Sequence, residues 1–122
     1  MKALLIVAHG SRREDSNQEV RQLTAQLATR TTDYSDVRCA FLELAAPSIP
    51  EGIAQCIAHG AQEVVVLPYF LSAGRHVAKD IPDEVAKAQQ AHPAAKLRIA
   101  PYLGMADGLK DTLLNLAAHP PV

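Results

Sequence analysis

The sequence predicts an α/β fold, in which four parallel strands form one sheet with helices packed on both faces. Four strand-like segments occur along the 122 residues, the first of them (residues 3–8) a continuous apolar run without alternation, and each is followed by apolar residues at helical spacing. A continuous apolar run is typical of a strand that is buried on both faces of a parallel sheet. Alternating strands and helices with short connections imply a parallel sheet with helices on both faces, joined by right-handed crossovers. We therefore expect one domain over residues 1–122.

The first half of the chain contains two strand–helix units. Residues 3–8 (ALLIVA) predict the first strand, and residues 15–16 (Asp-Ser) can cap the helix that follows it. Residues 37–44 (VRCAFLEL) predict the second strand. Pro47 or Pro50 then opens the second helix, because the fixed φ of proline is tolerated in a first turn. The expected buried stripes are Val20, Leu23 and Leu27 in the first helix and Ile49, Ile53 and Ile57 in the second.

The second half repeats this order. Residues 63–71 (EVVVLPYFL) predict the third strand, whose hydrogen-bond ladder should loosen at Pro68. Asp80 can cap the third helix. Residues 96–101 (KLRIAP) predict the fourth strand, and the last helix follows Asp107. The residues expected to face the core are Ile81, Val85 and Ala88 in the third helix and Leu109, Leu113 and Leu116 in the last.

Composition and charge narrow the class of partner. Apolar residues make up 48% and charged residues 20%, which is typical of a soluble globular protein. The net charge of -1 argues against nucleic acid as the main partner, because such a partner usually needs a basic face. No apolar run approaches the roughly 20 residues of a membrane span or resembles a signal peptide. Cys39 and Cys56 form no CxxC pair and lie in apolar segments, as small buried side chains do in a reducing compartment. We expect a cytoplasmic protein without a nucleic-acid or membrane partner.

Three polar side chains lie where predicted strands end. His9 follows the first strand, Glu43 lies at the end of the second, and His76 lies in the loop after the third. The loops that leave the carboxyl ends of parallel strands share one edge of the sheet, where ligands bind. Two imidazoles and a carboxylate suit cobalt, nickel, iron or zinc. The alternatives are hydrogen-bonded loop roles for the histidines and an arginine partner for Glu43.

Basic residues flank the same predicted edge. We call Arg12, Arg13, Arg75 and Lys79 the basic collar, and we group Ser11 with them as candidates for binding substrate. Each one alone is typical of a solvated surface. Together they predict a site for a polycarboxylated ligand, because guanidinium groups bind carboxylates through two parallel hydrogen bonds.

Two motifs resemble those of the small cobaltochelatases, a branch of the class II tetrapyrrole chelatases. The similarity is carried by LLIVAHGSRREDSN at the start and by LPYFLSAGRHVAKDIP after the third strand. With FLELAAPSIPEGI between them, it covers most of the chain. In this family the metal-site histidines match His9 and His76, and a carboxylate of longer relatives corresponds to Glu43.

The resemblance implies a flavodoxin-like three-layer fold and a metal-insertion activity that uses no ATP. The substrates it implies are a divalent ion, cobalt first with nickel or ferrous iron as alternatives, and sirohydrochlorin or a related acidic tetrapyrrole. The pathway would be cobalamin or sirohaem synthesis, and no tightly bound cofactor is implied. Longer relatives carry two such domains across a cleft. This chain would then be one half, and a homodimer would rebuild the cleft.

Two other functions stay open at this point. A non-enzymatic carrier of metal or tetrapyrrole would use the same residues, and only a faster insertion rate distinguishes an enzyme from it. A phosphoryl-transfer enzyme could use His9 as a nucleophile, but histidine phosphatases carry arginine directly before that histidine, where this chain has Ala8. Residues 9–12 (HGSR) match neither GxGxxG nor a Walker motif, so we expect no nucleotide.

Overall fold

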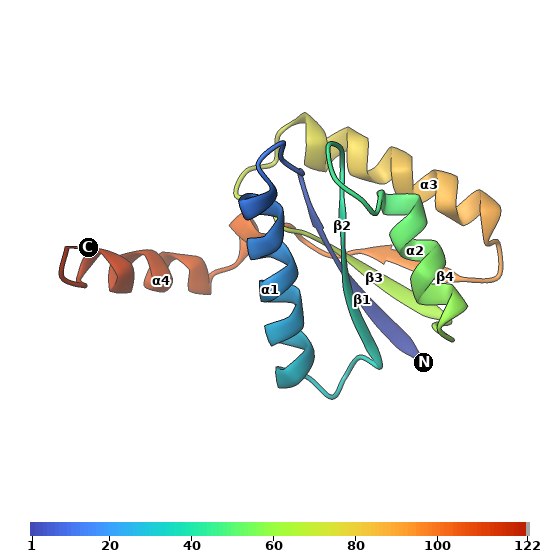
Figure 1. Cartoon of the computed structure of the whole chain (residues 1–122), viewed down its shortest axis with the longest axis horizontal. Helices are drawn as coiled ribbons and strands as arrows, with labels where there is room; N and C mark the ends of the chain where they lie inside the picture. The colour runs from blue at the N-terminus through green and yellow to red at the C-terminus, as the bar shows by residue number, and fades with distance from the viewer. Residues whose placement is uncertain (122) are drawn as a thin grey trace.

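The computed structural model describes residues 1–121, and at its centre is a four-stranded sheet with helices on both sides (Figure 1). All neighbouring strands are parallel, in the order β2-β1-β3-β4. The strands are β1 (Lys2–Ala8), β2 (Asp36–Phe41), β3 (Glu63–Pro68) and β4 (Lys96–Ile99). The helices are α1 (Glu14–Arg30), α2 (Ile49–Ala58), α3 (Ile81–Ala91) and α4 (Gly108–Ala117), with a π-helical turn η1 (His76–Asp80) and a 3-10 turn η2 (Leu103–Met105). The predicted parallel α/β fold is confirmed.

The hydrophobic core lies between the sheet and the pair of helices α2 and α3. Alternate residues of the two central strands point to this face and are buried, together with the stripes predicted for both helices, of which only Ile57 is partly exposed. Cys56 is part of this core, and desolvation by burial raises the pKa of its thiol to about 11. The thiol therefore stays protonated, as expected of a small buried side chain. Cys39 is half-buried, and both cysteines are free.

The opposite face of the sheet is covered less completely. Within residues 1–121 it is α1 that packs there, mainly against β2. The apolar stripe of α1 (Val20, Leu23 and Leu27) is only half-buried, as is Val37 of β2. This face therefore has apolar surface left to cover.

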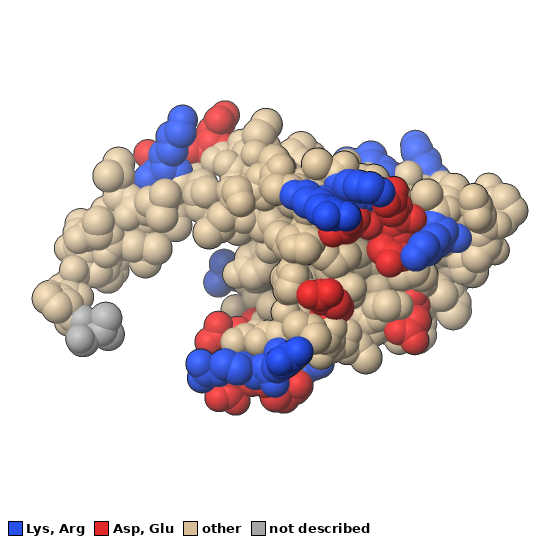
Figure 2. All heavy atoms as spheres, turned by 90° about the horizontal axis from the view of Figure 1, so that it is seen from above, with Lys and Arg blue, Asp and Glu red and all other residues tan. Residues whose placement is uncertain are grey.

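Helix α4 extends away from the body of the molecule (Figure 1). None of its residues is buried, and Leu113 and Leu116 are 57% and 64% exposed. The expectation that Leu109, Leu113 and Leu116 face the core is therefore wrong. Helical spacing identifies an apolar face, but it does not identify the surface that the face meets. In Figure 2, α4 forms an arm at the left with few charged side chains, and a hollow separates it from the body.

Several element boundaries differ from those predicted. Strands β2, β3 and β4 end at Phe41, Pro68 and Ile99, each a few residues early. Helix α1 has Arg13 at its N-cap without a side-chain cap, so the predicted cap at residues 15–16 is wrong. No helix among residues 1–121 is both long and apolar enough to cross a membrane.

The start of α2 is set by local hydrogen bonds. Ser48 forms a capping box with Glu51, and these bonds lower the pKa of the Glu51 carboxyl. Pro50 lies in the first turn, as predicted, while Pro47 precedes the helix. The cap therefore fixes where the chain turns back toward the sheet after β2.

Candidate functional site

The loops after β1 and β2 hold His9 and Glu43 side by side. The backbone N–H of Glu43 donates to the carbonyl of His9 at 3.0 Å, and His9 Nε2 lies 3.3 Å from Glu43 Oε1. His9 Nδ1 lies 2.9 Å from the carbonyl of Gly10. A carbonyl only accepts, so Nδ1 carries the proton and a neutral His9 turns the lone pair of Nε2 toward the Glu43 carboxylate. Two facing acceptors repel each other unless a cation, a proton or a water molecule lies between them.

Gly10 lets these two loops approach each other. Its φ of +94° lies in the left-handed region, and a Cβ atom added there would lie 1.7 Å from the carbonyl oxygen of Glu43. The buried side chain of Asn17 ties down the same loop, because it accepts from the Ser11 N–H at 3.0 Å and donates to the Ser11 carbonyl at 2.9 Å. Neither role was predicted from the sequence. The glycine directly after His9 was the available signal.

His76 reaches the same place from a third loop. It begins η1, and its ring lies edge-to-face against that of His9, with centroids 4.7 Å apart. Its Nδ1 lies 2.9 Å from Asp80 Oδ2. The prediction that Asp80 caps α3 is wrong, because its backbone is helical and its side chain makes no cap hydrogen bond. Its carboxylate binds His76 instead.

The three residues predicted to meet do lie together at the carboxyl edge of the sheet. Glu43 stands in the loop beyond β2, and not at the end of that strand as predicted, because β2 stops at Phe41. Among residues 1–121, no group of three or more His, Cys, Asp or Glu side chains is placed closely enough to hold a metal ion as the side chains stand. The arrangement is an open one, and the side chains of His9 and His76 are 40% and 45% exposed.

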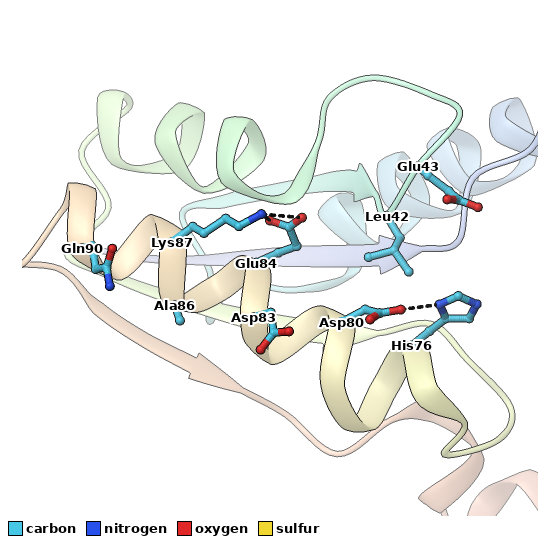
Figure 3. A pocket seen from close by; sticks show the side chains of 9 residues that line it. All are labelled: Leu42, Glu43, His76, Asp80, Asp83, Glu84, Ala86, Lys87 and Gln90. Atoms are coloured by element: carbon cyan, nitrogen blue, oxygen red, sulfur yellow. Dashed lines mark hydrogen bonds and ion pairs between the residues drawn. The ribbon is translucent and has the colours of Figure 1, made fainter.

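A groove of about 530 Å³ leads from His76 along α3 (Figure 3). Glu43 and His76 lie at one end of it, and Figure 3 shows Asp80 turned toward His76 there. Farther along, Glu84 pairs with Lys87 at 3.1 Å. The remaining lining residues are Leu42, Asp83, Ala86 and Gln90. Carboxylates outnumber basic groups along the groove, which favours cations at the end that holds His76.

The basic collar does not form one continuous patch. Arg12, Arg13 and Arg75 are exposed, and within residues 1–121 they make no ion pair. Lys79 donates to Asp83 at 2.7 Å, and this hydrogen bond raises the pKa of Lys79. On the face in Figure 2, basic and acidic side chains are interspersed. Ser11 Oγ accepts from the backbone N–H of Arg13 at 3.0 Å, so it orders the loop.

Comparison with known proteins identifies related sequences. The model of the CbiX family matches residues 3–119. The sirohydrochlorin ferrochelatase of Arabidopsis thaliana chloroplasts is 36% identical over 95% of this chain and 51% of its own length. A sirohydrochlorin cobaltochelatase of Methanococcus maripaludis is 38% identical over 67% of this chain and 56% of its own. The chain spans about half the length of the curated relatives it matches.

Solved structures with the same fold include one short and one long chain. A putative cobalamin biosynthesis CbiX protein from Marinobacter aquaeolei gives a TM-score of 0.82 at 24% identity, covering 96% of this chain and 94% of that one. The sirohydrochlorin chelatase SirB of Bacillus subtilis subspecies spizizenii, in complex with cobalt, gives 0.85 at 28% identity, covering 93% of this chain and 48% of that one. The fold thus occurs both in a chain of similar length and within a chain about twice as long.

Proposed function

The chain belongs to the CbiX family, and on that premise we propose that it inserts a divalent metal ion into sirohydrochlorin or a closely related acidic tetrapyrrole without ATP. The observation that carries this proposal is the facing pair of acceptors, His9 Nε2 and Glu43 Oε1, at 3.3 Å beside the ring of His76. Imidazole nitrogen and carboxylate oxygen attract a first-row divalent cation between them. The partial exposure of both histidines leaves room for a second ligand.

The residues match the chemistry of insertion. When a divalent ion enters a tetrapyrrole, its bonds to the ring nitrogens replace two pyrrole N–H bonds, and two protons leave. His9 and His76 would hold the incoming ion through Nε2, and either imidazole can accept a proton once the ion has moved to the macrocycle. Glu43 would balance the charge of the ion at the moment of transfer. The site therefore needs no nucleotide or resident cofactor.

We propose cobalt as the metal, with nickel and ferrous iron as the competing substrates, in cobalamin or sirohaem synthesis. Relatives named as cobaltochelatases and as ferrochelatases both match, and cellular supply often selects among these ions.

The two free cysteines suit a reducing compartment such as the cytoplasm, which we propose as the location of the protein.

An insertion assay tests the proposal. Sirohydrochlorin would be mixed with Co²⁺, Ni²⁺, Fe²⁺ or Zn²⁺ under anaerobic conditions, and its absorbance followed with and without the protein. We expect catalytic acceleration over the spontaneous rate, largest with Co²⁺. Binding of metal or tetrapyrrole without any acceleration would indicate the carrier function, and formation of phosphohistidine from a phosphate monoester would indicate phosphoryl transfer.

The basic collar leads to a prediction about substrate affinity. Replacing Arg12, Arg13 and Arg75 together by alanine should weaken tetrapyrrole binding roughly tenfold, because each exposed charge pair contributes up to about 1 kcal/mol. Binding of Co²⁺ should change little, and added salt should weaken tetrapyrrole binding to the wild type. Lys79 should matter less, because it must first leave Asp83. The affinity is measured by titrating the protein with sirohydrochlorin and following the quenching of its tyrosine fluorescence.

Arg30→Ala is the matched control for the collar, since this arginine lies at the far end of α1. Its tetrapyrrole affinity should equal that of the wild type. If the triple variant bound the tetrapyrrole as tightly as the wild type, the basic collar would have no role in binding substrate.

We also propose that two copies of the chain pair as a homodimer, with α4 of each covering apolar surface of the other. A helix of this length is marginal by itself in water, so its exposed leucines need a surface. The half-covered α1 face and the hollow beside α4 offer such a surface (Figure 2). Further apolar side chains, Tyr69, Leu71 and Met105, are exposed near the base of α4. A second copy would also bring two sites toward a shared cleft.

Sedimentation tests this pairing. The wild type at micromolar concentration should sediment as a dimer of the 13.1 kDa chain. Leu113→Glu combined with Leu116→Glu should shift it to monomer, because charge on the apolar face cannot be buried without a partner. Asn115→Glu, on the other side of α4, should leave the dimer intact. A wild type that sediments only as monomer would contradict the proposal.

A further inference from the structure

The first observation concerns the proton on His76. Its Nδ1 lies 2.9 Å from Asp80 Oδ2, and a carboxylate accepts hydrogen bonds. Nδ1 therefore carries the proton of a neutral His76, and Nε2 carries the lone pair. His9 has the same arrangement through a different partner, because the Gly10 carbonyl occupies its Nδ1. Both imidazoles therefore present the lone pair of Nε2, the atom that can bind a metal ion.

The second observation is that the Asp80 side chain does not cap α3, although its position suggests that it would. It precedes α3, where an aspartate normally caps the helix. Here η1 runs directly into α3, and the Ile81 N–H already donates to the His76 carbonyl. The Asp80 side chain makes no cap bond, and Figure 3 shows its carboxylate turned to the His76 ring. The π-helical turn thus holds these two side chains on one face, four residues apart.

From these contacts we propose that Asp80 is a positioning residue for His76. It fixes the ring in the Nδ1–H tautomer and aims Nε2 at the space shared with His9 and Glu43. The idea rests on the proposed function for its biological meaning. A free imidazole in water prefers the other tautomer, with the proton on Nε2, which would block that nitrogen as a metal ligand. A partner that holds the second nitrogen of a metal-binding histidine typically contributes 10–100-fold in metal affinity.

The test reads the tautomer directly in the protein without metal. Nitrogen-15 NMR at a pH where the ring is neutral distinguishes Nδ1–H from Nε2–H for His76. We expect Nδ1–H in the wild type and a shift to Nε2–H in Asp80→Ala. Asp80→Asn should keep Nδ1–H, because its amide oxygen still accepts from the ring. Asp83→Ala is the control: it removes a carboxylate from the same groove without touching His76.

Binding of Co²⁺ to the same variants gives the second readout. The Co²⁺ dissociation constant should rise about tenfold in Asp80→Ala, and its visible d–d spectrum should lose the contribution of one imidazole. Asp80→Asn should recover most of the affinity, and Asp83→Ala should bind as the wild type does. An Asp80→Ala variant that keeps Nδ1–H on His76, or that binds Co²⁺ like the wild type, would overturn the positioning role. Failure of wild-type protein to insert metal would instead overturn the proposed function, because the tautomer is measured without metal or tetrapyrrole.

Discussion

Replacing both His9 and His76 by alanine should reduce insertion of cobalt into sirohydrochlorin to the rate without protein. Each single replacement should cost at least about tenfold, the scale expected when a positioned acid–base group is lost. The double replacement also removes both nitrogen ligands, so only Glu43 of the three proposed ligands would remain. The loss should appear in single-turnover insertion followed by absorbance.

The folded state should survive these changes. Both side chains are partly exposed, and neither belongs to the core between the sheet and α2 and α3. Thermal unfolding of the variants should stay close to that of the wild type. His59→Ala is the matched control, since His59 bonds to a backbone carbonyl at the end of α2, away from the site. A double variant that inserts cobalt at the wild-type rate would contradict the mechanism.

Gly10→Ala should have the second large effect, and it acts through the backbone. The added Cβ would lie 1.7 Å from the Glu43 carbonyl oxygen, and the φ of +94° is already unfavourable for any residue with a Cβ. The two loops must then separate, which moves His9 away from Glu43. A misplacement of about 1 Å at a reacting centre can cost roughly 100-fold in rate. The strain should also lower the free energy of unfolding by about 2 kcal/mol.

Gly74→Ala provides the comparison for this variant. Gly74 lies in the loop before His76, but apart from its own residue and its two chain neighbours nothing lies within 4 Å of the position where its Cβ would stand. Its insertion rate and its denaturant midpoint should therefore match those of the wild type. If Gly10→Ala also matched the wild type in both measurements, the close approach of the two loops would have no functional role.

The common location of His9, Glu43 and His76 could be predicted because the parallel topology of the sheet determines which loops lie together. Once β1, β2 and β3 are recognised as parallel neighbours, the residues just beyond them share one edge. The prediction needed no knowledge of side-chain geometry. It placed Glu43 in a strand that ends earlier, but the edge was the same.

The role of Asp80 could not be read from the sequence, because an aspartate before a helix has two possible acceptor roles. Propensity favours the N-cap. In the structure the Asp80 carboxylate accepts from His76 and does not cap α3. The backbone of the π turn already satisfies the Ile81 N–H, so no side-chain cap is needed there. A π turn is rare and has no simple sequence signal, so a search for the usual helical period does not predict it.

The error over α4 has a different physical origin. Apolar spacing of Leu109, Leu113 and Leu116 specifies one face of a helix, and burial in the same chain was the default assumption. Nothing in that pattern distinguishes a surface of the same chain from that of a partner. The half-covered α1 face of the sheet becomes visible only in three dimensions.

We propose that His9, His76 and Glu43 together hold the metal ion that is inserted. The most direct measurement is anomalous X-ray diffraction at the cobalt edge from crystals of the protein soaked with Co²⁺. The account predicts one cobalt peak at the carboxyl edge of the sheet, bonded to Nε2 of both histidines and adjacent to the Glu43 carboxylate. A cobalt ion bound elsewhere in the groove, such as at Asp83 and Glu84, with neither histidine as a ligand, would contradict it.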